Sequence, residues 1–165
     1  MLALGKRTGY DIKQLVDTMT AYFWTASYGQ IYPELRKLEE HGLIVGRSEP
    51  TGERPRTAYR LTEAGRQALN RWLASDAPPA VELRDEGMLK LFFSDAVPGQ
   101  QVAIVRAIRE RNERKRVTLH ALAPLIADGP TGPALALELG IGCTQALIDW
   151  CVTTERRLTA DTDGD

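Results

Sequence analysis

Apolar residues recur with the 3.6-residue period of helices along most of the chain, and with a period of two in one short region. A first helix is predicted over residues 10–19, because one of its faces would be wholly apolar. That face comprises Ile12, Leu15, Val16 and Met19. Residues 1–4 look like the last turn of a helix that begins upstream, and Gly5 would end that turn.

A second helix is predicted over residues 27–41. Ser27, followed three residues later by Gln30, has the form of a capping box, and Gly42 stands where a helix-ending glycine belongs. Its apolar stripe comprises Ile31, Leu35 and Leu38. Pro33 leaves two alternatives open, because proline inside a helix clashes with the carbonyl four residues earlier. Either the helix bends there, or its regular part starts near Tyr32 with Pro33 in the first position.

The period then changes to two. Residues 43–49 and 56–61 are predicted as strands of a hairpin, since the residues between them are rich in turn formers. Thr62 would cap the next helix. The buried side of that helix is expected to comprise Ala68, Leu69, Trp72 and Leu73. Two consecutive prolines, Pro78 and Pro79, end the helical pattern and mark a domain boundary.

The second half is predicted to be helical over 82–95, 98–127 and 134–159. We expect the charged run 109–116 to be a solvated helix face. Two long antiparallel helices with broad apolar faces need a partner, so dimerisation through this half is the expected solution. The residues expected at that interface are Val102, Val105, Leu119, Leu122, Leu147 and Trp150.

The predicted fold is therefore mainly α, of the α+β kind. A winged helix-turn-helix domain at 1–76 would precede a helical dimerisation and effector domain at 80–160, with a disordered tail at 161–165. The length of 165 residues suits one domain or two small ones, and the composition excludes collagen, low-complexity disorder and disulfide-rich scaffolds. No run approaches the ~18 uninterrupted apolar residues of a membrane span. Without a signal peptide at the N-terminus, we expect a cytoplasmic protein that does not bind membranes.

The net charge of −1 conceals an asymmetry between the two halves. Residues 1–75 carry 11 Lys and Arg against 8 Asp and Glu, a charge of +3, whereas residues 76–165 carry −4. Only the first half therefore suits a polyanionic partner.

The cysteines and histidines of the chain indicate neither a disulfide nor a metal site. Cys143 and Cys151 lie eight residues apart in a predicted helix, a rise of ~12 Å, which excludes a disulfide between them. They are expected to be semi-buried thiols. His41 and His120 stand apart from any metal-ligand spacing, so neither a metal nor a cofactor is expected.

The order helix, helix, strand, turn, strand, helix is that of the winged helix-turn-helix, in which the second helix enters the major groove and the wing at 50–56 contacts phosphates. Such a groove-facing helix needs hydrogen-bonding groups and cations. The candidate DNA-binding residues are Lys13, Ser27, Tyr28, Gln30, Tyr32, Arg36 and Lys37 in the helices, with Arg54, Arg56 and Thr57 in the wing. Tyr32 is expected either to pack against the wing or to contact a phosphate.

Several ordered motifs resemble the PadR family of bacterial transcriptional regulators. These are Thr8-Gly9-Tyr10-Asp11-Ile12, the run from Ser27 to Glu39, Gly42-Leu43-Ile44, Tyr59 to Gly65, and Glu82 to Glu86 with Leu89 to Phe93. The resemblance implies a dimeric repressor of an inverted-repeat operator in double-stranded DNA. It also implies release by a small, often aromatic or phenolic, compound. The chain departs from the family where Thr8 replaces the usual histidine.

An effector of that kind would need a pocket, and a cluster of large apolar residues is the candidate: Met88, Phe92, Phe93 and Trp150. Plain core packing is the alternative role for them. An enzyme is not expected, because the chain lacks a nucleophile–base pair, and the only Gly-x-Gly, at Gly140 and Gly142, lies inside a helical pattern. The remaining alternative is a winged-helix module that contacts proteins without binding specific DNA.

Overall fold

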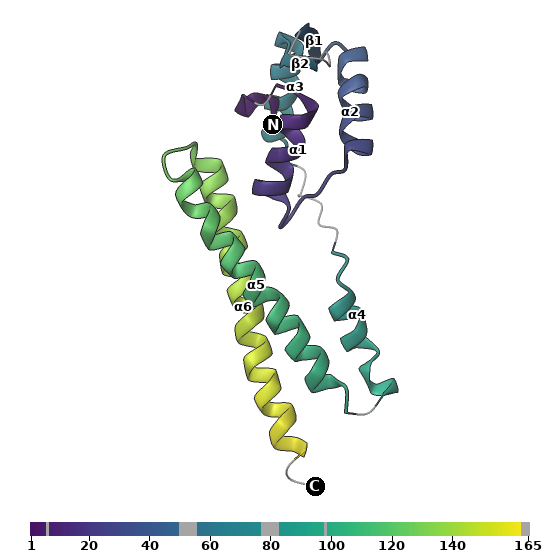
Figure 1. Cartoon of the computed structure of the whole chain (residues 1–165), viewed down its shortest axis with the longest axis vertical. Coiled ribbons are helices and arrows are strands. Elements are labelled where there is room, and N and C mark those ends of the chain that lie inside the picture. The colour runs from purple at the N-terminus through teal and green to yellow at the C-terminus, as the bar shows by residue number, and fades with distance from the viewer. Residues whose placement is uncertain (6, 50–55, 77–82, 98, 163–165) are drawn as a thin grey trace. The chain divides into compact units, whose positions relative to one another are not determined.

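The computed structural model describes residues 1–5, 7–49, 56–76, 83–97 and 99–162. The chain divides into two compact units, Met1–Ala80 and Val81–Asp165 (Figure 1). The first contains helices and a hairpin, and the second consists of helices joined by short turns in its described residues. The fold class is as predicted: mainly helical, with a winged helix-turn-helix followed by two long helices packed together.

The first unit begins with a short 3-10 turn, η1 (Leu2–Leu4), which Gly5 ends in the left-handed conformation as predicted, at φ 81°. Helix α1 (Gly9–Leu15) follows. The expected helix over 10–19 is not regular to its end, because Val16–Thr20 form a π-helical turn, η2. Ile12 and Val16 nevertheless point into the core, as the apolar stripe predicts.

Helix α2 (Tyr28–Glu40) begins after Ser27, and Gly42 follows it at φ 66°. The capping box is present, with the Gln30 side chain accepting the backbone N–H of Ser27 at 2.8 Å. Pro33 lies inside the helix. Of the two alternatives, a regular helix that starts only near Tyr32 is therefore wrong.

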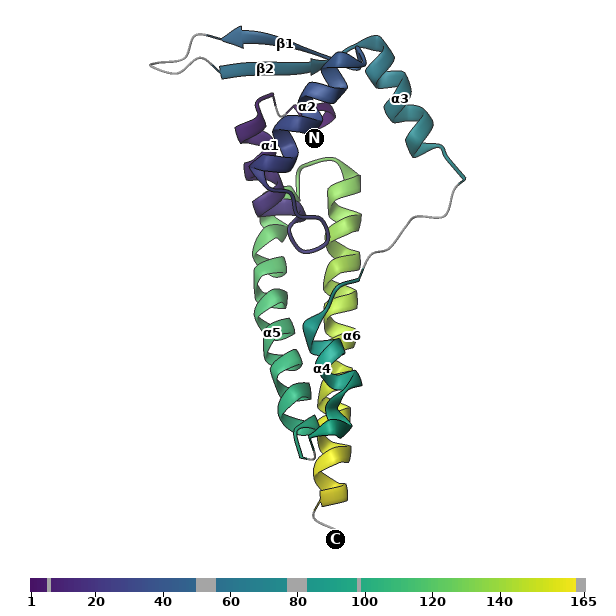
Figure 2. The same ribbon diagram turned by 90° about the vertical axis from the view of Figure 1, so that its right-hand side faces the viewer.

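Strands β1 (Ile44–Glu49) and β2 (Arg56–Leu61) pair antiparallel, with Ile44 opposite Leu61 and Glu49 opposite Arg56 (Figure 2). The core of this unit lies between α1, α2 and β1. Its buried side chains are Ile12, Val16, Ile31, Leu35 and Ile44.

Helix α3 (Glu63–Leu73) starts at the predicted cap, where the Thr62 hydroxyl accepts the N–H of Gly65 at 3.0 Å. The expectation for its buried side is wrong in part. Trp72 is 72% exposed and Leu73 is 66% exposed, because only the first turns of α3 approach the hairpin.

The second unit comprises α4 (Glu86–Phe92), the 3-10 turn η3 (Ser94–Ala96), α5 (Gln101–Ile126) and α6 (Thr131–Thr162). Helices α5 and α6 run side by side along their length (Figures 1 and 2). Val105 and Leu119, both expected at a dimer interface, are instead buried inside this pair, at 0% and 1% exposure. Within one chain these two side chains therefore belong to the core of the helical unit.

The charged run 109–116 is not the uniform solvated face that we expected. Arg109 donates to Glu155 of α6 at 2.7 Å and to Glu113 at 2.9 Å. Arg116 donates to Gln145 at 2.7 Å. The run therefore links α5 to its neighbours, because arginine reaches across a helix interface from a position that looks polar in sequence.

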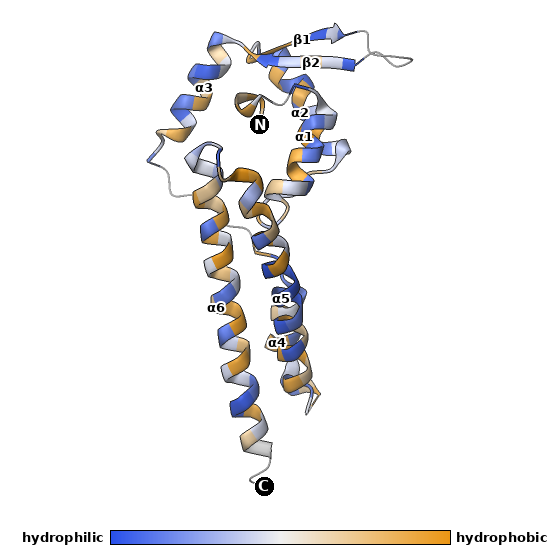
Figure 3. Ribbon diagram, turned by 60° about the vertical axis from the view of Figure 1, so that its left-hand side comes forward, coloured by the Kyte–Doolittle hydropathy of each residue, from blue (hydrophilic) through white to orange (hydrophobic). Residues whose placement is uncertain are grey.

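A second apolar face of α6 is exposed in the part of the chain that the structure describes. Its exposed side chains are Leu135, Leu139, Leu147 and Trp150, and Figure 3 shows apolar positions recurring along the helix. The helical residues Thr131–Ala160 are long enough and apolar enough to cross a membrane, because an 18-residue window within them has a mean hydropathy of 1.3. Helix α6 also packs along α5, and the core helix of a globular protein can pass the same test, so this property alone is weak evidence for a membrane span.

Candidate nucleic-acid interface

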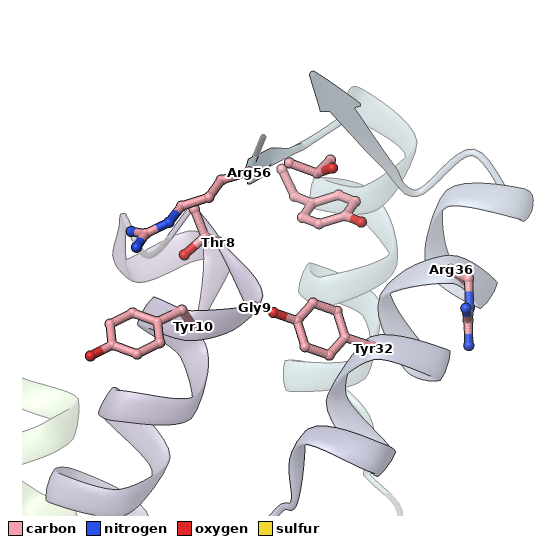
Figure 4. Close-up of a pocket in the computed structure, with 8 residues that line it drawn as sticks. Thr8, Gly9, Tyr10, Tyr32, Arg36 and Arg56 are labelled. Carbon is pink, nitrogen blue, oxygen red and sulfur yellow. The ribbon is translucent and has the colours of Figure 1, made fainter. Parts of the chain in front are cut away.

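Helix α1, helix α2 and strand β2 surround a groove with a cavity volume of about 440 Å³ (Figure 4). Its lining residues are Thr8, Gly9 and Tyr10 from the start of α1, Tyr32 and Arg36 from α2, and Arg56, Thr57 and Tyr59 from β2. We call this surface the α1–α2–β2 groove.

The start of α1 is fixed by hydrogen bonds on two sides. Thr8 and Asp11 form a capping box, in which the Thr8 hydroxyl accepts the N–H of Asp11 at 3.1 Å and Asp11 accepts that of Thr8 at 3.0 Å. The carbonyl of Arg7 accepts the N–H of Tyr59 in β2 at 2.7 Å. The two bonds to Thr8 and the bond to Arg7 hold one wall of the groove against the sheet.

Helix α1 approaches α2 closely at Gly9. A β-carbon at this position would lie 2.6 Å from Cε1 of Tyr32, so a larger residue could fit only if the ring moved. The absence of a side chain at Gly9 therefore sets the position of the Tyr32 ring at the base of the groove (Figure 4).

Aromatic rings lie next to cations both in the groove and beside it. The Arg56 guanidinium lies over the ring of Tyr10, 5.6 Å from its centroid. Tyr28 and Tyr32 stack with centroids 6.1 Å apart, and the Lys13 ammonium lies 5.8 Å from the Tyr28 centroid. These rings restrict where the long cationic side chains lie, which lowers the entropy cost of using them to bind an anion.

The cations differ in how far they are neutralised. Lys13 pairs with Asp17, and Lys37 lies 3.8 Å from Glu34. Arg36 and Arg56 form no ion pair with any residue in the described part of the chain. The groove thus presents two guanidinium groups that are not neutralised by a carboxylate among the described residues. Such groups can bind an anion such as a phosphate.

The Tyr59 hydroxyl adds a neutral donor to this wall. Burial raises the pKa of Tyr59 above its usual value, and the nearby Glu39 carboxylate raises it further. Tyr59 consequently stays protonated at neutral pH and can donate a hydrogen bond to an anion.

Gln30 is more constrained than its sequence position suggests. Its side-chain oxygen already accepts the backbone N–H of Ser27 at 2.8 Å and the Ser27 hydroxyl at 3.1 Å. A glutamine that reads adenine uses both its oxygen and its amide nitrogen. While the cap is intact, Gln30 therefore offers only its two N–H donors.

Of the residues expected to bind DNA, the groove brings together Tyr32, Arg36, Arg56 and Thr57. The others, Lys13, Ser27, Tyr28, Gln30 and Lys37, do not line it, and Arg54 falls outside the described residues. Sequence reasoning did not assign a role in the groove to Thr8, Gly9, Tyr10 and Tyr59. The capping pattern of Thr8 and Asp11 was a usable signal, but the proximity of Tyr59 depends on strand pairing.

Of the four residues expected to form an effector pocket, Phe93 is the one that lines the cavity between α4 and α5. Met88, Phe92 and Trp150 do not line that cavity. Phe92 instead meets Phe93 edge to face at 5.0 Å and is 79% exposed.

Two known protein families match consecutive parts of the chain. The transcriptional regulator PadR-like family matches residues 1–71. The C-terminal domain family of virulence activator alpha matches residues 83–159.

The negative transcriptional regulator PadR of Bacillus subtilis is 36% identical over 104 residues, which are 62% of this chain and 57% of that protein. The match thus spans little more than half of that relative. In solved structures, Bacillus subtilis PadR in complex with operator DNA superposes with a TM-score of 0.80 at 27% identity, covering 91% of this chain and 89% of that one. The same regulator with p-coumaric acid superposes at 0.76 and 27%, covering 92% and 90%.

Proposed function

Because the chain belongs to the PadR-like family of transcriptional regulators, which are not enzymes, we propose that it is a homodimeric repressor that binds an inverted-repeat operator. Helix α2 would enter the major groove, and the wing at 50–56 would contact the phosphate backbone. The observation that carries the proposal is that Arg36 and Arg56, neither in an ion pair within the described residues, both line one groove with Tyr10.

Phosphate contacts would come mainly from the α1–α2–β2 groove. Its arginines lie on two different elements, α2 and β2, so they could contact a DNA backbone at two points and fix the orientation of α2. Exposed polar groups near the start of α2, namely Ser27, Tyr28 and the amide of Gln30, would then face the base edges. Bacillus subtilis PadR, whose structure was solved with operator DNA, supports this mode of binding.

A second copy of the chain would cover the open apolar face of α6. Leu147 and Trp150, 43% and 45% exposed, belong to that face. Burying such side chains is favourable by roughly 25 cal/mol for each Å² removed from water. A dimer with twofold symmetry would also match an inverted-repeat operator.

We also infer control by a small aromatic compound, with the protein located in the cytoplasm alongside its DNA. The structure of Bacillus subtilis PadR with p-coumaric acid supports an effector of this class.

The deciding experiment is fluorescence anisotropy with the DNA upstream of the protein's own gene, measured across a salt series. A specific regulator should prefer that duplex to a scrambled one of equal length. Its log K should also fall with log salt by ~0.9 for each phosphate contact. Equal affinity for both duplexes would contradict autoregulation, and absence of any salt-dependent binding would favour the protein-interaction alternative.

A further inference from the structure

One rung of the two-stranded ladder is held from outside the sheet on both edges. At this rung Gly46 of β1 lies opposite Tyr59 of β2. The Gly46 N–H donates to Oε1 of Glu39 in α2 at 2.7 Å. The Tyr59 N–H donates to the carbonyl of Arg7 at 2.7 Å. Antiparallel ladders alternate pairs that bond each other with pairs that do not, and this pair is of the second kind. We call it the Gly46–Tyr59 rung.

The hydrogen bond to Glu39 depends on the absence of a side chain at Gly46. A β-carbon there would lie 2.9 Å from Oε1 of Glu39 and 2.8 Å from Cγ2 of Thr57. Any larger residue would therefore push the carboxylate or the strand aside. Glu39 lies in the last turn of α2, seven residues before Gly46, so its side chain joins the end of α2 directly to the backbone of β1.

Past the Gly46–Tyr59 rung, toward the wing tip, the hairpin has little packing to hold it. Most of its described residues there are exposed: Arg47, Ser48, Arg56 and Thr57. Ala58 is buried, at 4% exposure. Arg7 pairs with Glu49 at 2.6 Å, but both side chains are exposed, and such ion pairs contribute little to stability. The direction in which the strands extend past α1 and α2 (Figure 2) is therefore set chiefly at the rung.

We propose that Glu39 is a positioning residue for DNA binding, which sets the wing against α2 through the Gly46 N–H. Glu39 does not itself contact DNA, because a carboxylate repels phosphates; it acts through the strand. With the rung held, the Arg56 guanidinium is already placed for a phosphate when α2 enters the major groove, and such preorganisation lowers the cost of binding. The inference rests on the proposed function, since it names the residue that joins the two DNA-contacting elements.

Three variants that each remove one negative charge separate this role from a purely electrostatic one. Glu39→Ala removes the acceptor of the Gly46 N–H, whereas Glu39→Gln keeps an acceptor oxygen. Glu40→Ala is the matched control. Glu40 is the exposed neighbour of Glu39 in α2 and forms no hydrogen bond with the sheet in the parts of the chain that the structure describes. Only Glu39→Ala should therefore release the wing.

The test is fluorescence anisotropy of the full chain with the DNA upstream of its own gene, measured across a salt series. For Glu39→Ala we expect binding about tenfold weaker, the effect of losing one charge-assisted hydrogen bond to a phosphate. Its slope of log K against log salt should flatten by ~0.9 for each wing phosphate that is no longer contacted. Glu39→Gln should restore both values, and Glu40→Ala should keep them. A lower melting temperature of Glu39→Ala with an unchanged salt slope would show a merely structural role and overturn the proposal.

A double-mutant cycle tests whether Glu39 acts through the wing. When Glu39→Ala is added to Arg54→Ala and Arg56→Ala, it should cause little further loss of affinity, because the wing at 50–56 then has no arginine left to position. A full additional tenfold loss would mean that Glu39 acts elsewhere, and would overturn the proposal.

Hydrogen exchange of the Gly46 amide in the free protein tests the same bond without DNA. Exchange should be faster in Glu39→Ala than in the wild type and Glu39→Gln, since only that variant removes the acceptor. Equal exchange rates, or equal DNA affinity and salt slope of Glu39→Ala and Glu39→Gln, would overturn the positioning role. Absence of salt-dependent DNA binding by the wild type would instead contradict the regulator proposal, so the two failures are distinguishable.

Discussion

Gly9 of α1 lies against the ring of Tyr32 in α2, so closely that a β-carbon on Gly9 would come within 2.6 Å of Cε1 of the ring. The contact joins the two helices that form the α1–α2–β2 groove. It also explains why Tyr32, which is 45% exposed, has a defined position beside Arg36 and Arg56.

Gly9→Ala should therefore weaken both the fold and DNA binding. Overpacking of this kind costs about 1–3 kcal/mol in the free energy of unfolding, and the displaced Tyr32 ring would disturb the groove. Thermal denaturation and anisotropy would measure the two effects. The control is Gly29→Ala in α2, where the nearest side-chain atom is at 3.7 Å and alanine should stabilise the helix by up to ~1 kcal/mol. Equal behaviour of the two variants would show that the Gly9 contact is unimportant.

Replacing Arg54 and Arg56 together by alanine should weaken binding to all duplexes alike, because wing arginines contact phosphates rather than bases. The slope of log K against log salt should flatten by about 0.9 for each phosphate that the wing no longer neutralises. Arg66→Ala is a suitable control, since Arg66 pairs with Glu63 at 2.6 Å. A weakening confined to one sequence would mean that the wing reads bases.

Gln30 should affect both helix stability and base preference. Gln30→Ala removes the acceptor of the capping box, which costs about 1 kcal/mol, and alters the preferred base by ~1–3 kcal/mol for each hydrogen-bonded base pair that is no longer recognised. Gln30→Glu retains the capping acceptor but places a negative charge toward DNA. We expect normal thermal stability with poor DNA affinity for Gln30→Glu. If its affinity matched wild type, Gln30 would not face the DNA.

The Asp85–Arg111 pair should make the second unit sensitive to acid. The pKa of the Asp85 carboxyl lies below its usual value, chiefly because Arg111 donates hydrogen bonds to it. A carboxyl with a depressed folded pKa stabilises the fold above its unfolded value, near ~3.9, and loses that contribution as pH falls through the folded pKa. Asp85→Asn retains the cap of α4 and removes the ion pair, so it should cost about 1 kcal/mol at pH 7. Melting curves of both proteins should converge below pH 4, and a constant difference would exclude the charge as its cause.

Leu147→Glu should dissociate the proposed dimer, because it places a charge on the open apolar face of α6, where Leu147 is 43% exposed. Sedimentation velocity would report a shift from dimer to monomer. Arg156→Glu, exposed on the other side of the same helix, changes the charge without touching that face and should leave the dimer intact. An unchanged dimer in Leu147→Glu would place the interface elsewhere.

Local signals along the sequence were sufficient to predict the order of the helices and strands and the residues at which many of them begin or end. The cap at Ser27 and Gln30, the helix-ending Gly42, and the change to a period of two at the hairpin each depend on residues within a few positions of one another. The π-helical turn at Val16–Thr20 has no such signal, because its apolar spacing is compatible with a regular α-helix.

The residue pattern alone was enough to specify a winged helix-turn-helix with a basic first half and a long helical second half. Which cationic side chains are left without an ion-pair partner, and so can bind an anion, depends instead on contacts between distant segments. Arg109 and Glu155 are 46 residues apart in the sequence, and Arg111 and Asp85 are 26 residues apart. No local pattern could show these two ion pairs. For the same reason, the sequence could name Arg36 and Arg56 as candidates but could not show that they line one groove with Tyr10. Helical and strand periods predict which face a residue occupies, but the partner on that face is set by packing between distant segments.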